Sequence, residues 1–171
     1  KGLSMYFFKR IIKAIKKRFF LIFALNDWNI YKKNLYKWEN SAENNECIII
    51  CNGPSIKSFD MSLIRNVDCF SMNRAYLAFN DWGFLPKYFV CVNELVLEQF
   101  CDDINTIDAH KFINYSKKNL FNSKNPNFLM LAFKDRIVNS FRSRLSTSAT
   151  VTFVSIQLAI LMGYKKIGII G

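Results

Sequence analysis

The sequence predicts an α/β fold: a Rossmann-like, mostly parallel sheet with helices on both faces. First, short continuous apolar runs recur through residues 46–171, and each has the length of a buried strand. Second, amphipathic segments with a helical period lie between these runs. Third, 171 residues with 51% hydrophobic content can bury one substantial core. Apolar strands that alternate with helices are typical of a parallel sheet covered on both sides.

The expected elements follow one another along the chain from a polar linker, "SAENNE", at residues 41–46. This linker separates an N-terminal extension, residues 1–40, from a nucleotide-binding domain, residues 46–171. Strands are expected over residues 46–51, 68–72, 88–92, 111–115, 128–133 and 166–170. Helices are expected near residues 60–66, 74–80, 95–105 and 150–162.

The extension carries most of the net charge of the chain, which is +11. Residues 1–38 hold ten Lys and Arg and only one acid, Asp27. In "FFKRIIKAIKKRFFLIF" the apolar residues share one helical face and the cations share the other. This pattern is typical of a helix lying on an anionic membrane surface. We therefore expect a cytoplasmic protein held peripherally at the inner membrane face. The alternative is that the apolar face packs on this protein's own core or on a partner. No motif supports binding to nucleic acid.

The cysteines and histidine argue against a metal site. The five cysteines form no Cys-x-x-Cys pair, and His110 is the sole histidine, so we expect no zinc site. The cysteines lie in apolar runs, and we expect reduced thiols that fill the core.

Three expected strands end in asparagine, in the segments "IIICNGPS", "CFSMNR" and "FVCVNE". Asn52, Asn73 and Asn93 would then meet at the carboxyl edge of the sheet, where open α/β folds bind ligands. An amide both donates and accepts, so it can contact a ribose, a base or a sugar without charge. The alternative is that each asparagine closes its own turn.

Two further segments offer places for a phosphate group. After Asn52, Gly53 permits close backbone approach, Pro54 stiffens the turn and Ser55 adds a hydroxyl. The segment "LSTSAT", which includes Thr147 and Ser148, precedes the expected helix at 150–162, where hydroxyls either bind an anion or cap the helix. Neither a Walker loop nor a G-x-G-x-x-G motif occurs.

The segments "IIICNGPSIKSFDMSLI", "FSMNRAYL", "GFLPKYFVCVNELVLEQF" and "TVTFVSIQLAILMGYKKIGIIG" resemble the MptE-like (6-hydroxymethylpterin diphosphokinase-like) domain family. That family is similar to the bacterial lipooligosaccharide sialyltransferases of glycosyltransferase family 42. The resemblance implies a donor-nucleotide site whose residues would be Asn52, Gly53, Pro54, Ser55, Asn73, Asn93, Thr147 and Ser148. MptE-like sequences often have an acidic residue near the position of Asn93, so the amide here resembles the sialyltransferases instead. Thr147 and Ser148 match a Thr-Ser pair that precedes the long helix in the relatives, with a spacing that differs by a few residues.

The resemblance implies a sialyltransferase-like glycosyltransferase of bacterial surface-glycan (lipopolysaccharide) synthesis, with a CMP-sugar donor, a glycan acceptor and no further cofactor. Two alternatives stay open: an ATP- and Mg²⁺-dependent pyrophosphokinase, and a non-catalytic nucleotide-binding or membrane-docking module. The relatives continue past the last strand into a segment that, in the sialyltransferases, carries the catalytic histidine, and His110 lies in no matching segment. We therefore expect a chain truncated at its C-terminus, with its catalytic residues unknown, inactive alone and able to associate with itself.

Overall fold

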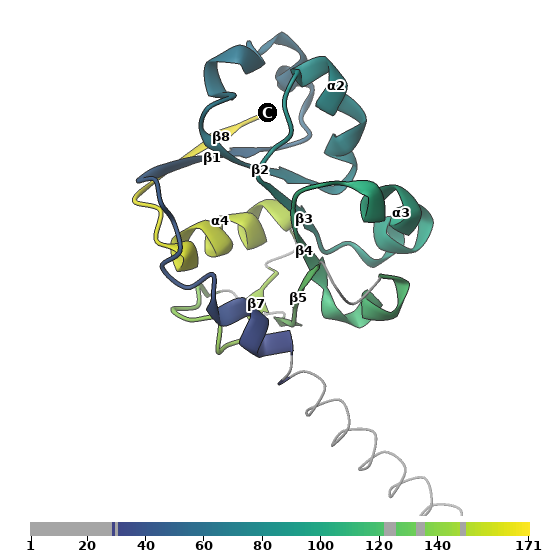
Figure 1. Cartoon of the computed structure of the whole chain (residues 1–171), viewed down its shortest axis with the longest axis vertical. Helices are drawn as coiled ribbons and strands as arrows, with labels where there is room; N and C mark the ends of the chain where they lie inside the picture. The colour runs from purple at the N-terminus through teal and green to yellow at the C-terminus, as the bar shows by residue number, and fades with distance from the viewer. Residues whose placement is uncertain (1–28, 30, 122–125, 133–135, 148–149) are drawn as a thin grey trace, which may run out of the picture.

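The computed structural model confirms the predicted fold class, a Rossmann-like α/β fold around one parallel sheet (Figure 1). It describes residues 29, 31–121, 126–132, 136–147 and 150–171. Six strands pair in the order β5–β4–β3–β2–β1–β8, and every pair is parallel. They are β1 (Glu46–Ile50), β2 (Asp68–Met72), β3 (Tyr88–Cys91), β4 (His110–Asn114), β5 (Asn127–Leu129) and β8 (Lys166–Ile170). Because all six run in one direction, their carboxyl ends share one edge.

Helical segments connect the strands. The two long ones are α3 (Glu94–Thr106) and α4 (Val151–Met162); the short ones are η1 (Pro54–Ser58), η2 (Met61–Ile64), η3 (Asn73–Ala78), α2 (Phe79–Trp82) and η4 (Tyr115–Leu120). The helices expected near residues 60–66 and 74–80 are therefore mainly 3₁₀ turns, which suit connections of only a few residues.

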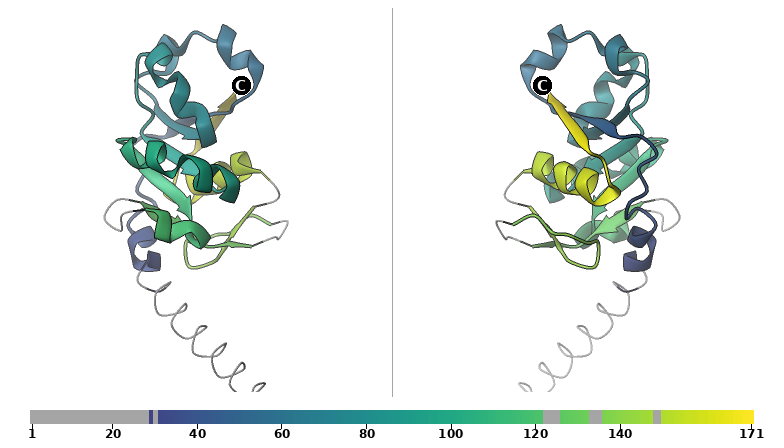
Figure 2. Two further views of the ribbon diagram at one scale, coloured as in Figure 1. Left: turned by 90° about the vertical axis from the view of Figure 1, so that its right-hand side faces the viewer. Right: turned by 90° about the vertical axis from the view of Figure 1, so that its left-hand side faces the viewer.

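The strand expected over residues 128–133 is divided. β5 ends at Leu129, and β6 (Leu131–Ala132) pairs instead with β7 (Leu145–Ser146) in a separate two-stranded sheet. β7 then leads toward α4, whose chain returns to the main sheet and adds β8 beside β1 (Figure 2). Thr147 and Thr150, the described residues that precede α4, therefore lie near the carboxyl edge of the sheet.

Side-chain alternation along the central strands divides the core into two layers. Tyr88 and Phe112 point to the face covered by α4, where Leu158 joins the same buried cluster. Their neighbours in sequence, Phe89 and Ile113, point to the opposite face, which α3 covers (Figure 1). Because both faces are covered, these strands are apolar throughout, as in other parallel sheets.

The described end of the N-terminal extension packs on the sheet. Residues 31–36 are helical, and Leu35 is buried in the main core. The Nε1–H of Trp38 donates to Oδ1 of Asn127 at 2.8 Å, which ties this segment to β5. The basic stretch that we predict to bind a membrane lies outside the described residues, so it stays a prediction. Within the described ranges, no helix is long and apolar enough to cross a bilayer.

The five cysteines are free thiols, as the sequence predicts. Cys47, Cys69 and Cys91 are buried, and burial raises the pKa of each of these thiols to about 12. A thiol with so high a pKa carries almost no thiolate at neutral pH, so these three side chains act as core residues rather than nucleophiles.

Candidate functional site

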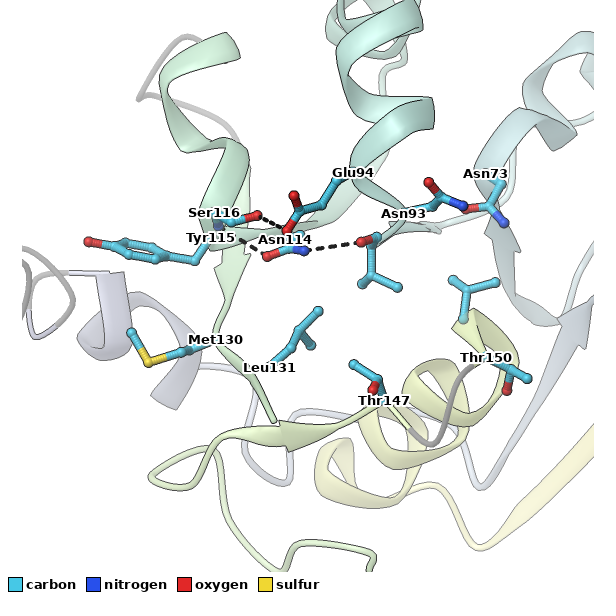
Figure 3. A pocket seen from close by; sticks show the side chains of 12 residues that line it. Asn73, Asn93, Glu94, Asn114, Tyr115, Ser116, Met130, Leu131, Thr147 and Thr150 are labelled. Carbon is cyan, nitrogen blue, oxygen red and sulfur yellow. Dashed lines mark hydrogen bonds between the residues drawn. The ribbon is translucent and has the colours of Figure 1, made fainter. Parts of the chain in front are cut away.

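A cavity of about 690 Å³ lies at the carboxyl edge of the sheet, bounded by the ends of β3–β5 and the N-terminus of α4 (Figure 3). This is the edge where open parallel sheets bind ligands. Its apolar and aromatic lining consists of Val92, Tyr115, Met130, Leu131 and Val151. Its polar lining includes Asn73, Asn93, Glu94, Asn114, Ser116, Thr147 and Thr150. Three predicted site residues, Asn73, Asn93 and Thr147, therefore line one cavity.

Asn73 enters the cavity from an unusual backbone conformation. Its φ of 51° lies in the left-handed region, which asparagine tolerates better than most residues. The Sγ of Cys91 donates to its Oδ1 at 3.6 Å, which fixes the orientation of the amide. The amide nitrogen has no hydrogen-bond partner within the described ranges and is available to a ligand.

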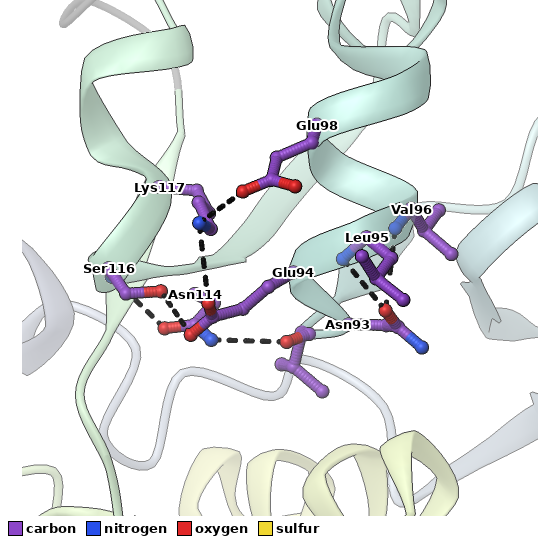
Figure 4. Close-up of polar contacts among 9 residues, drawn as sticks. Asn93, Glu94, Leu95, Val96, Glu98, Asn114, Ser116 and Lys117 are labelled. Atoms are coloured by element: carbon purple, nitrogen blue, oxygen red, sulfur yellow. Dashed lines mark hydrogen bonds and ion pairs between the residues drawn. The ribbon is translucent and has the colours of Figure 1, made fainter.

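Asn93 is the N-cap of α3. Its Oδ1 accepts hydrogen bonds from the backbone N–H groups of Leu95 at 3.0 Å and Val96 at 3.4 Å (Figure 4). This is the capping role that we gave as the alternative to ligand binding. The two roles are compatible, because the cap uses the oxygen and leaves the amide NH₂ without a partner among the residues described.

Asn114 also lines the cavity, and the sequence reasoning missed it. Its Nδ2 donates to the carbonyl oxygen of Val92 at 3.1 Å, and its Oδ1 accepts from the N–H of Ser116 at 3.0 Å. We expected the strand to continue through residue 115, which placed Asn114 inside it. In fact β4 ends at Asn114, just as β2 and β3 end one and two residues before an asparagine. The repeated asparagine at strand ends is the sequence pattern that could have indicated Asn114.

A charged group stands at the rim of the cavity. The carboxylate of Glu94 accepts a hydrogen bond from Oγ of Ser116 at 2.8 Å, and Nζ of Lys117 lies 3.3 Å from its Oε2 (Figure 4). Lys117 also pairs with Glu98, one turn further along α3. The bond from Ser116 and then the one from Lys117 hold the pKa of Glu94 below its usual value. Glu94 is therefore ionised at neutral pH and can only accept hydrogen bonds.

The opposite side of the cavity is formed by the start of α4. Thr150 is the N-cap, and its Oγ1 accepts from the N–H of Phe153 at 3.1 Å. Three residues earlier, Thr147 is 9% exposed, and its Oγ1 is buried without a hydrogen-bond partner within the described ranges. A buried hydroxyl without a partner costs free energy, and such groups are rare in folded proteins. The predicted partner residue Ser148 lies outside the described residues.

The loop of residues 52–55 follows β1 at the carboxyl edge of the sheet, but none of these described residues lines the cavity. The Nδ2 of Asn52 donates to the carbonyl oxygen of Met72 at 3.2 Å, which braces β1 against β2. A Cβ on Gly53 would lie 2.6 Å from the carbonyl carbon of Gly171, so glycine is required there by close backbone approach. Pro54 begins η1, and Ser55 is exposed. Donor contact by these four residues stays a prediction.

His110 stands at the far end of the sheet from the cavity. It begins β4, which ends at Asn114, and its ring packs edge-on against Trp38 with 4.8 Å between the ring centroids. Burial and then the positive charges of Lys37 and Lys87 lower the pKa of His110 below its usual value of 6.5. Within the described ranges, no three His, Cys, Asp or Glu side chains gather as a metal site.

The fold and the cavity together define a Rossmann-like α/β protein with a candidate ligand site at the carboxyl edge of its sheet. No protein-family model matches the sequence, and no curated protein matches it. Among solved structures, the chain is similar to the MAf glycosyltransferase from Magnetospirillum magneticum AMB-1, with a TM-score of 0.53 and 14% sequence identity. The similarity covers 81% of this chain and 26% of that chain, so this chain spans about a quarter of the glycosyltransferase. At this identity, the likeness shows a shared fold.

Proposed function

We propose that the chain forms the donor-binding part of a transferase that uses a nucleotide-activated donor, of the glycosyltransferase class. The donor is a CMP-sugar, and the acceptor is a glycan of the bacterial surface. The observation that carries the proposal is the cavity at the carboxyl edge, lined by Asn73, Asn93 and Thr147. The fold shared with a bacterial glycosyltransferase supports the same class.

The chemistry of the cavity suits a nucleotide held by neutral groups. The amide nitrogens of Asn73 and Asn93 are free to donate within the described part of the chain, and the helix N-terminus at Val151 favours an anion. The apolar side chains of Met130 and Leu131 face the same space and offer a surface for a base or a sugar ring. A cavity of this kind orients a phosphate ester through hydrogen bonds.

We expect CMP to bind more tightly than ATP with Mg²⁺, by about tenfold or more, which is about 1.4 kcal/mol. The reason is that amides and hydroxyls around one cavity match a single phosphate. A triphosphate with its metal also needs several carboxylates for Mg²⁺, and the described lining offers one, Glu94. Isothermal titration calorimetry on the whole 171-residue chain measures both affinities. Tighter binding of Mg-ATP than of CMP would favour the pyrophosphokinase alternative and contradict the proposal.

A further inference from the structure

Glu94 lines the cavity, but the proposed donor site so far gives it no role. Among the described residues that line the cavity, it is the one carboxylate, and a nucleotide brings negative charge into the same space. Repulsion is reduced because Nζ of Lys117 lies 3.3 Å from Oε2 of Glu94. Lys117 is shared with Glu98, so it offsets part of the negative charge of the pair. The fold therefore keeps an ionised carboxylate at a site where an uncompensated one would repel the ligand.

We propose that Glu94, together with Ser116, is the subsite for the ribose of the donor nucleotide, with the carboxylate accepting hydrogen bonds from the 2′ and 3′ hydroxyls. This inference rests on the proposed function, because it requires a ribonucleotide in the cavity. A carboxylate has about four lone-pair positions. Ser116 and Lys117 occupy two of them, so two remain for a pair of neighbouring hydroxyls.

The position of Glu94 fits a ribose better than a phosphate. Figure 3 shows Glu94 and Ser116 on the opposite side of the cavity from Thr147 and Thr150. The side with the threonines includes the N-terminus of α4, which favours the anionic phosphate. A nucleotide that directs its phosphate to α4 would direct its sugar away from it, toward the carboxylate. Acidic side chains bind ribose hydroxyls in the same manner in dinucleotide-binding folds.

A second glutamate on α3 also pairs with Lys117. Glu98 pairs with the same lysine from one turn further along the helix, but it does not line the cavity in the described structure. The two glutamates therefore share Lys117, but of the two only Glu94 lines the cavity. Replacing Glu98 is a matched control for replacing Glu94, because each substitution removes one partner of Lys117.

The test compares CMP with 2′-deoxy-CMP, each titrated by calorimetry into the whole chain and its variants. The wild type is expected to bind CMP about tenfold more tightly, because 2′-deoxy-CMP loses one hydrogen bond to a charged acceptor. Glu94→Ala should bind both nucleotides within about twofold of each other, since the acceptor is gone. Glu98→Ala should keep the preference of the wild type. Both glutamates are exposed, so neither substitution should prevent folding.

Two results would overturn the ribose subsite while leaving the donor site standing. One is equal binding of CMP and 2′-deoxy-CMP by the wild type, and the other is a preference for CMP that survives in Glu94→Ala. If neither nucleotide binds the wild type, the proposed function fails and the subsite fails with it. The experiment therefore separates a wrong subsite from a wrong function.

Discussion

Asp68→Ala is expected to lower the free energy of unfolding by about 2–4 kcal/mol, because Asp68 is a buried charge with several partners. It is 8% exposed at the start of β2. Its carboxylate accepts hydrogen bonds from the hydroxyl of Tyr164 at 2.6 Å, from Nζ of Lys87 at 3.0 Å and from the amide of Asn44 at 3.3 Å. The substitution leaves the ammonium and the buried hydroxyl without this acceptor.

The same carboxylate makes stability depend on pH. Burial acts to raise the pKa of Asp68, but the hydrogen bonds from Tyr164, Lys87 and Asn44 outweigh it and lower the pKa below 3.8. Since the folded-state pKa lies below the unfolded-state value, the contribution is present at neutral pH and is lost as the pH falls below about 4. Asp68→Asn keeps an acceptor for Tyr164 and should cost less than Asp68→Ala.

Urea unfolding of the wild type and both variants, at about pH 7 and about pH 3, measures these differences. The gap between wild type and Asp68→Ala should narrow at the acidic pH, where the wild-type carboxylate begins to be protonated. A gap of the same size at both values would show that packing, rather than charge, accounts for the loss. Equal free energies of unfolding for the wild type and Asp68→Ala at neutral pH would contradict the stabilising role of the buried carboxylate.

Thr147→Val is expected to have the opposite sign and to raise the free energy of unfolding by about 1 kcal/mol. The two side chains have the same shape, and valine removes a buried hydroxyl that has no partner within the described ranges. The same change should weaken CMP binding, because a turn of the Thr147 side chain would bring its buried, unpartnered hydroxyl to a ligand in the cavity that this residue lines. Thermal unfolding and calorimetry on one preparation measure the two effects.

Thr150→Val is the matched control on the same helix. Its hydroxyl caps α4 through the N–H of Phe153, so the identical chemical change there should lower the free energy of unfolding by about 1 kcal/mol. A gain in the free energy of unfolding for Thr147→Val and a loss for Thr150→Val would support a ligand-binding role for the Thr147 hydroxyl. A loss of stability in Thr147→Val would indicate a partner for Oγ1 in the free protein, and unchanged CMP affinity would remove Thr147 from the site.

The sheet and its carboxyl edge could be predicted because both depend on local patterns. Strands buried on two faces must be apolar throughout, so runs such as residues 68–72 and 88–92 stand out against their polar connections. Parallel strands bring their carboxyl ends together, so the positions of Asn73 and Asn93 directly after two such runs were enough to place both at one edge.

The remaining features depend on contacts between segments far apart in sequence. Gly53 follows an apolar strand, but its close approach to the backbone of Gly171, directly after β8, is visible only in the fold. The hydrogen bond between Glu94 and Ser116 joins residues 22 positions apart, and no local pattern indicates it. Asn114 was missed because strand ends are uncertain by a residue or two in sequence.

The measurement that tests the central claim most directly is nuclear magnetic resonance on the whole chain during titration with CMP. We expect the side-chain NH₂ signals of Asn73 and Asn93 to shift in a saturable manner, together with the backbone N–H signals of Glu94 and Val151, because these groups border the cavity. CMP that binds without shifting any of these signals would occupy another place on the protein and would contradict the site.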